Sequence, residues 1–154
     1  MKKLVLSLAV LAAIPLSASA DEAALAKQVE AGKMSYMMCA ACHGMDGKGV
    51  AAGPSLMAPT LVGSKVALGD PAVMALVIIN GIQKEGTEYL GMMASLGAAL
   101  DDQKLADVMT YVRNSFDNKA AAVTAEDAKK YREQWKDTVG PVSRAKIAEL
   151  SAKK

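Results

Sequence analysis

The spacing of apolar positions predicts two amphipathic helices in the first 117 residues of the chain. The first covers residues 22–38, with apolar or small positions three or four residues apart: Leu25, Val29, Gly32 and Tyr36. The second begins at a capping aspartate, Asp101 or Asp102, and its apolar positions share one face: Leu105, Val108, Met109, Val112 and Phe116. Each helix therefore has one side to bury against the rest of the chain.

A third helix is predicted over residues 72–80, which are apolar on every side. Asp70 and Pro71 are typical of a helix start, and Gly81 is typical of a helix end. A helix that is apolar all round is expected to lie between other elements. Glycine-rich loops at 44–64 and 81–100 flank this helix, and no alternating strand pattern is convincing, so the predicted fold is all-α.

Residues 118–154 form a further helical region at the C-terminus. Thr124 and Asp127 have the spacing of a capping box, and Ser143 begins a shorter final helix. Residues 21–117 hold seven basic and eleven acidic residues, whereas residues 118–154 hold nine and five. We therefore expect a C-terminal extension that folds back onto its own acidic domain or meets an acidic partner.

The first twenty residues resemble an export signal and are set apart from the fold. Lys2 and Lys3 precede an apolar run, and Ala18-Ser19-Ala20 is a small-residue cleavage site. The apolar run is shorter than the roughly 20 residues that cross a bilayer. We expect a periplasmic protein of residues 21–154, in which 21–117 form the main domain, without stable membrane insertion after cleavage.

Charge and cysteine content exclude several classes of function and of metal or redox site. The main domain is acidic, whereas nucleic-acid binding requires a basic surface, so no nucleic-acid partner is expected. Both cysteines and the only histidine fall within five positions, as Cys39, Cys42 and His43. A disulfide would leave the adjacent histidine unexplained, and a redox-active pair lacks its usual βαβ context. A structural zinc site requires four ligands, and these residues supply three unless a carboxylate joins them.

The remaining interpretation uses all three residues, because Cys-x-x-Cys-His is the attachment motif of a covalent c-type haem. His43 would then ligate the iron. No second histidine exists for the other side of the iron, so the sixth ligand is a methionine, a lysine, a tyrosine, a terminus, water or nothing. The abundance of methionine favours that residue.

Around this motif, the chain resembles the class I cytochromes c over about residues 28–117. Gly32 and Tyr36 are similar to the glycine and aromatic residue that pack against the last helix of that family, here at Tyr111. The stretches "HGMDGKG" and "APTLVGS" are similar to its haem loops. The resemblance implies an all-α class I cytochrome c fold around one haem c.

The resemblance also implies further site residues. In the family, a proline carbonyl accepts the Nδ1 hydrogen of the haem histidine, and Pro59 matches this role better than Pro54. The family's ligand methionine lies seven residues before the leucine that precedes the helix cap. Counting back from Leu100 gives Met93 rather than Met92, and Met57 in the other loop is the next candidate.

The function implied is one-electron transfer without enzymatic catalysis, between transient redox protein partners. The extension resembles those of cytochrome c domains that serve periplasmic dehydrogenases, so a dehydrogenase is a possible donor. Two alternatives remain: a haem enzyme or gas sensor with an open sixth iron position, and a cytochrome subunit that is permanently docked to a dehydrogenase.

Overall fold

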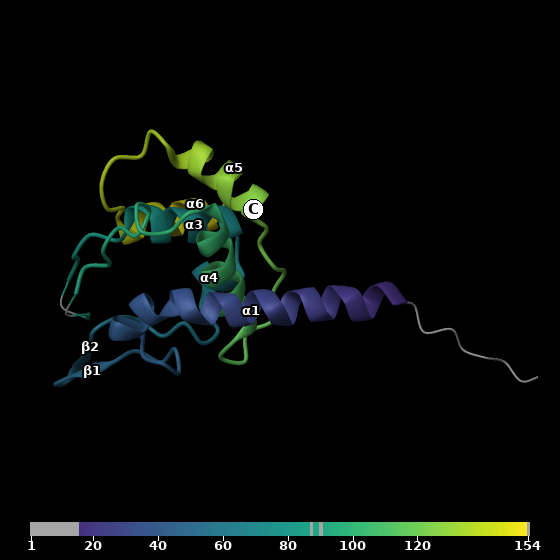
Figure 1. Cartoon of the computed structure of the whole chain (residues 1–154). Coiled ribbons are helices and arrows are strands. Elements are labelled where there is room, and N and C mark those ends of the chain that lie inside the picture. Colours follow the sequence, from purple (N-terminus) through teal and green to yellow (C-terminus); the bar gives the residue numbers. More distant parts are fainter. Residues whose placement is uncertain (1–15, 87, 90, 154) are drawn as a thin grey trace, which may run out of the picture.

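The computed structural model describes residues 16–86, 88–89 and 91–153. Residues 1–15 of the expected signal lie outside the described residues, and the remaining five begin the first helix. Figure 1 shows the predicted all-α arrangement, together with one small hairpin that the sequence pattern does not indicate. Over the described residues, no helix is long and apolar enough to cross a membrane. The elements are α1 (Leu16–His43), β1 (Ala51–Ala52), β2 (Ser55–Leu56), α2 (Lys65–Leu68), α3 (Pro71–Asn80), α4 (Asp102–Asn114), α5 (Ala125–Trp135) and α6 (Arg144–Ser151).

Helices α1 and α4 cross at a glycine. A Cβ atom on Gly32 would overlap the carbonyl oxygen of Asp107 and lie 2.7 Å from the Cβ of Tyr111. Next to the crossing, the rings of Tyr36 and Tyr111 are 5.0 Å apart, and Phe116 completes a cluster of three aromatic rings. The predicted contact between the first and last helices of the domain is therefore confirmed.

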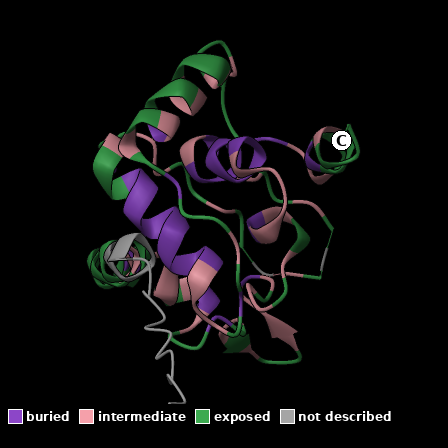
Figure 2. Ribbon diagram, turned by 90° about the vertical axis from the view of Figure 1, so that its right-hand side faces the viewer, coloured by how far each residue is buried: buried purple, intermediate pink, exposed green. Residues whose placement is uncertain are grey.

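Helix α3 has the predicted ends and the predicted burial. The Asp70 carboxylate accepts a hydrogen bond from the Ala72 amide at 2.9 Å, and Gly81 ends the helix at a φ of +77°. Its residues from 72 to 78 are all buried, and Figure 2 shows the buried residues concentrated in α3 and α4.

Helix α4 is buried more widely than its amphipathic pattern predicts. The N-terminal cap is Asp101, and every residue from 105 to 113 is buried, including polar ones. The reason is the chain that follows, because Val123 and Ala128 join the core cluster from the other side. The Thr110 hydroxyl accepts a hydrogen bond from the Val123 amide at 2.9 Å, which satisfies one of the buried polar groups.

Residues 118–154 pack onto α3 and α4 as α5 and α6. The Thr124–Asp127 capping box and the Ser143 cap are both present. Trp135 donates its indole hydrogen to the Ala72 carbonyl at 2.7 Å, and Ile147 lies in a second apolar cluster with α3 residues. The extension therefore folds back onto its own domain, which is the first of the two arrangements expected from its charge. In Figure 1 it lies on the α3 side of the molecule, away from the hairpin.

Candidate functional site

The three motif residues occupy the last turn of α1. Cys39 and Cys42 are three positions apart, so their side chains lie on nearby faces of the helix, and His43 is its final residue. Both thiols are free. Burial, followed by the charge of Cys42, raises the pKa of Cys39 to about 11. A redox-active pair requires a lowered pKa, so this environment favours a protonated thiol instead.

A zinc site at the motif would need a further ligand beside the two cysteines and the histidine. In the part of the chain that the structure describes, no three side chains of His, Cys, Asp or Glu form a group suited to holding a metal ion. The carboxylate that a zinc site would need beside Cys39, Cys42 and His43 is therefore not seen there.

His43 is held in one orientation by a backbone carbonyl. Its Nδ1 lies 3.0 Å from the Pro59 oxygen, and the residue is only 9% exposed. A carbonyl only accepts hydrogen bonds, so Nδ1 carries the hydrogen and Nε2 keeps its lone pair. Burial lowers the pKa of His43, although the bond to Pro59 opposes this effect. The neutral imidazole therefore has one nitrogen ready to ligate a metal.

Close backbone approaches in the loop after α1 bring Pro59 to this histidine. The Gly49 amide donates to the His43 carbonyl at 2.7 Å, and the Leu61 amide donates to the Gly47 carbonyl at 2.7 Å. Gly49 has a φ of +93°, and a Cβ there would lie 2.5 Å from the Ala58 oxygen. Only glycine fits this position without strain.

Pro54 has a different place. It is exposed in the turn of the β1–β2 hairpin, whose register pairs Ala51 with Leu56 and Ala52 with Ser55. The carbonyl next to the His43 ring belongs to Pro59. Sequence spacing left both prolines open, because it does not indicate how the loop folds.

Met93 is fixed by its own backbone. Its amide donates to the Ile82 carbonyl, and the Ile82 amide donates to the Met93 carbonyl, both at 2.9 Å. This is the closely bonded pair of an antiparallel ladder, in which successive side chains point to opposite sides. Accordingly Met93 is half-buried and packs against both core clusters, whereas Met92 is 57% exposed. Met57 is also half-buried.

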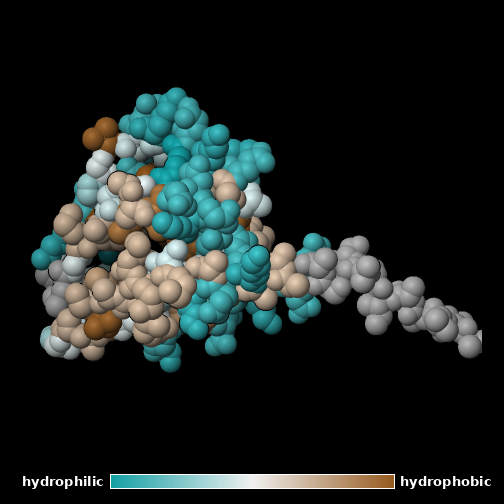
Figure 3. All heavy atoms as spheres, viewed as in Figure 1, coloured by the Kyte–Doolittle hydropathy of each residue, from teal (hydrophilic) through white to brown (hydrophobic). Residues whose placement is uncertain are grey.

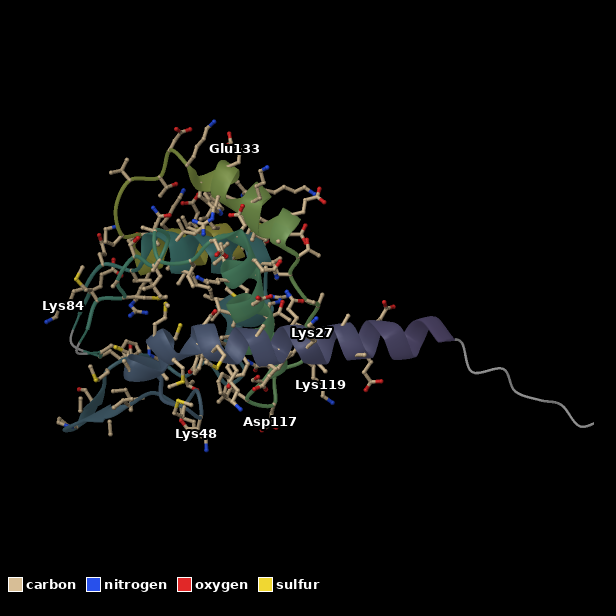
Figure 4. All side chains as sticks on the ribbon, viewed as in Figure 1. Lys27, Lys48, Lys84, Asp117, Lys119 and Glu133 are labelled. Carbon is tan, nitrogen blue, oxygen red and sulfur yellow. The ribbon has the colours of Figure 1, made fainter. Side chains whose placement is uncertain are left out.

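Apolar side chains surround this end of the molecule. Figure 3 shows an apolar surface over the C-terminal half of α1 and the hairpin, in contrast to the hydrophilic surface over α5. In Figure 4 the sulfur atoms gather in the same region, with Lys48 and Lys84 at its outer edges. Three large apolar side chains that adjoin the motif in the sequence are exposed: Met37, Met38 and Met45.

These features fit a covalently attached haem c. Neither thiol is in a disulfide, and Nε2 of the histidine is available as a ligand. The exposed apolar side chains nearby could contact a large apolar ring. The sequence indicates the motif residues but does not indicate Ile82 as the partner of Met93. The only local signal for that pairing is a β-branched residue directly after the helix-ending Gly81.

Comparison with known proteins agrees with this chemistry. The family model described as Cytochrome c matches residues 29–116. The cytochrome c subunit of alcohol dehydrogenase (quinone) from Gluconacetobacter polyoxogenes is 36% identical over 110 residues, which are 68% of this chain and 22% of that protein.

Two further relatives are similar in extent. The corresponding subunit from Gluconobacter oxydans (strain 621H) is 36% identical over 112 residues, 70% of this chain and 22% of that protein. The fructose dehydrogenase cytochrome subunit of Gluconobacter japonicus is 29% identical over 115 residues, 70% of this chain and 23% of that protein. The chain thus spans about a fifth of the length of these relatives.

The matched relatives are cytochrome subunits, and the family carries haem c on a motif of the kind found at the end of α1. The predictions of a covalent haem, an all-α fold and a protein that is not an enzyme are confirmed. The chain belongs to the class I cytochrome c family, with similarity to the cytochromes of bacterial dehydrogenases.

Proposed function

We propose that this chain is a periplasmic one-electron carrier whose haem c is attached through Cys39 and Cys42 and ligated by His43 and Met93. When bound, the haem supplies a one-electron change between the ferrous and ferric states of its iron. The observation that carries the proposal is the fixed orientation of His43, whose Nδ1 lies 3.0 Å from the Pro59 oxygen. Met93 is separately held by two backbone hydrogen bonds to Ile82.

Each residue has a distinct part in this function. Pro59 orients the His43 ring and, by accepting its hydrogen, makes the imidazole a stronger ligand. The thioether of Met93 is a soft ligand, which raises the reduction potential. The apolar residues around α1 and α3 keep water away, and exclusion of water also disfavours the extra charge of the oxidised state.

The ligand assignment is tested by Met93→Ala with Met92→Ala as its matched control. Met93→Ala should abolish the charge-transfer band of methionine-ligated ferric haem, lower the reduction potential, and let carbon monoxide bind rapidly to the reduced protein. Met92→Ala should leave all three unchanged. Loss of the band in Met92→Ala alone would move the ligand by one residue. If both variants keep the band, Met57 is the next candidate.

The attachment residues have their own test. In Cys39→Ala and Cys42→Ala, one covalent link is lost, and the yield of haem protein should fall sharply. Wild-type protein on a denaturing gel should keep the haem-peroxidase stain on its band. Stain that runs free of the wild-type band would contradict covalent attachment at this motif.

We also propose that the electron donor is a dehydrogenase and that the contact is transient. The support is the similarity to dehydrogenase cytochrome subunits, together with the exposed apolar side chains of Met37, Met38 and Met45 next to the motif. Transient redox contacts are typically small. Size-exclusion chromatography of a native periplasmic extract tests this. Elution at the size of the single chain supports a carrier, and co-elution with a dehydrogenase supports a docked subunit.

A further inference from the structure

The strongest unassigned feature is the contact between the C-terminal extension and the segment that holds Met93. Residues 117–154 lie outside the part that matches the family model, which ends at residue 116. Nevertheless, the extension forms backbone hydrogen bonds with residues 81–83, directly beside the Met93 pairing. The inference below rests on the proposed ligation by Met93.

Ile82 is the central member of a three-segment backbone ladder. On one side it pairs antiparallel with Met93, and on the other it pairs in parallel with Val142. The Val142 amide donates to the Gly81 carbonyl at 3.0 Å, and the Gln83 amide donates to the Val142 carbonyl at 3.1 Å. Ile82 is thus held from both sides, and the extension supplies the side opposite Met93.

The extension is itself anchored just before this ladder. The buried Asn80 side chain, at the end of α3, donates to the carbonyls of Thr138 at 2.8 Å and Gly140 at 3.2 Å. Val142 is 7% exposed and lies in the second apolar cluster with α3 residues. These contacts fix the chain on both sides of Pro141, so Val142 meets Ile82 in a defined register.

Arg144 extends the support along the same loop. Its backbone amide donates to the Glu85 carboxylate at 2.9 Å, and its guanidinium lies 5.0 Å from the centre of the Tyr89 ring. Tyr89 in turn forms a parallel bridge with Leu56 of the hairpin. Two described residues before Met93, Glu85 and Tyr89, therefore contact the extension, and Tyr89 also pairs with the hairpin.

We propose that Val142 and Arg144 are positioning residues for the sixth iron ligand. Through Ile82 and Tyr89 they hold the loop whose far end presents the Met93 thioether. A loosely held loop would let the thioether leave the iron more often, so the extension controls how long the methionine stays bound.

The test measures the rate at which carbon monoxide binds to the reduced, full-length haem protein at saturating gas. Under that condition the rate reports departure of the methionine, because the ligand must leave before the gas can bind. Val142→Pro removes the amide that bonds to Gly81, and we expect a rate about five-fold higher than wild type, the effect of one lost hydrogen bond. Ile147→Ala, in the same cluster but without backbone bonds to the described residues between 81 and 93, should stay within about two-fold.

A milder pair covers the case in which Val142→Pro does not fold. Arg144→Ala loses the cation over Tyr89 and should bind the gas about two- to three-fold faster, and Arg144→Lys should restore most of the wild-type rate. Lys146→Ala is the control, because the Lys146 side chain pairs with Glu149 within α6. If Val142→Pro or, failing that, Arg144→Ala matches its control, the positioning role is overturned.

Loss of ligation by Met93 can be distinguished experimentally from loss of support by the extension. If Met93→Ala keeps its charge-transfer band, the ligand assignment and this inference both fall. If Met93→Ala loses the band but the Val142 and Arg144 variants behave as their controls do, the ligand stands and only the role of the extension falls. Equal acceleration in Val142→Pro and Ile147→Ala would show that general packing, rather than the ladder, holds the loop.

Discussion

Gly81 lies so close to Met93 that a Cβ atom on residue 81 would overlap the Met93 carbonyl oxygen. The same glycine ends α3 with a φ of +77°, a conformation that strains any residue with a side chain. The residue after it, Ile82, then pairs with Met93. One glycine therefore ends the buried helix and makes room for the segment that carries the candidate ligand.

Gly81→Ala should damage both stability and ligation. We expect a loss of about 2–4 kcal/mol in the free energy of unfolding, from backbone strain and overlap together. The Met93 backbone has to shift, so the ferric charge-transfer band should weaken or vanish. Urea unfolding and a visible spectrum measure the two effects.

Gly63→Ala is the matched control for this substitution. Gly63 has a similar φ of +63°, but a Cβ there would meet nothing within 4 Å. Strain alone should cost about 1–2 kcal/mol, and the band should remain. Equal losses of stability and of the band in the two variants would contradict the close approach of Gly81 to Met93.

At the crossing of α1 and α4, two neighbouring positions should have opposite preferences, with glycine favoured at residue 32 and alanine favoured at residue 31. Gly32→Ala should destabilise the protein by about 1–3 kcal/mol, because the new Cβ overlaps the Asp107 carbonyl, although alanine is the better helix former. At the exposed Ala31, Ala31→Gly should itself cost up to about 1 kcal/mol. Thermal unfolding of both variants checks this, and a stabilised Gly32→Ala protein would contradict the close crossing.

The features that could be predicted from the sequence are those with local causes. The cap of α4 at Asp101 and the capping box of α5 depend on side chains that bond within three residues along the chain. The first helix was predicted over 22–38 but spans Leu16–His43, because no glycine or proline interrupts it between Pro15 and Gly44 except Gly32 at the crossing. The haem motif needs only five consecutive residues.

Contacts between distant residues have no such local cause, and those that were predicted, such as Tyr36 with Tyr111, came from the family resemblance. The ladder of Met93, Ile82 and Val142 joins backbone groups, and backbone bonds leave no periodic pattern of side chains. The wide burial of α4 likewise depends on Val123 and Ala128 covering its second face. The division into a cytochrome c domain at 21–117 and a C-terminal helical extension at 118–154 stays a prediction, and both regions share apolar clusters.

Arg113 is a buried charge whose hydrogen bonds go to backbone carbonyls. Its guanidinium donates to Ala67 at 2.6 Å, to Gly69 at 3.2 Å and to Ala121 at 2.8 Å. Burial lowers the pKa of Arg113. Arg113→Met should cost about 2–4 kcal/mol, because it leaves these carbonyls without a donor.

Arg113→Lys separates the charge from the geometry. Lysine keeps the charge but not the planar fork of donors, so its cost should fall between wild type and Arg113→Met. Urea unfolding measures both variants, and the haem spectrum should stay unchanged in both. If Arg113→Lys is as stable as wild type, the three carbonyl contacts do not account for the role of this residue.

Arg132 attaches α5 to the turn that precedes α4, and its contacts are of two kinds. Its Nε lies 2.6 Å from the Asp102 carboxylate, its Nη1 donates to the Gly97 carbonyl at 2.9 Å, and its Nη2 donates to the Leu100 carbonyl. Both charged side chains are partly exposed, at 26% for Arg132 and 37% for Asp102. Solvent therefore weakens the ion pair more than it weakens the bonds to the carbonyls of the half-buried Gly97 and the buried Leu100.

The two kinds of contact are separated by comparing Arg132→Met with Asp102→Asn. Arg132→Met loses every contact and should cost about 1–3 kcal/mol, whereas Asp102→Asn keeps the carbonyl bonds and should cost less than about 1 kcal/mol. Lys130→Met, which breaks the exposed pair with Glu126, is the control and should change stability by less than about 0.5 kcal/mol. Raising the salt concentration from about 0.01 to 1 M should shrink the cost of Asp102→Asn and leave most of the cost of Arg132→Met. If the two costs are equal and vanish together in high salt, the ion pair, and not the backbone carbonyls, attaches α5 to the domain.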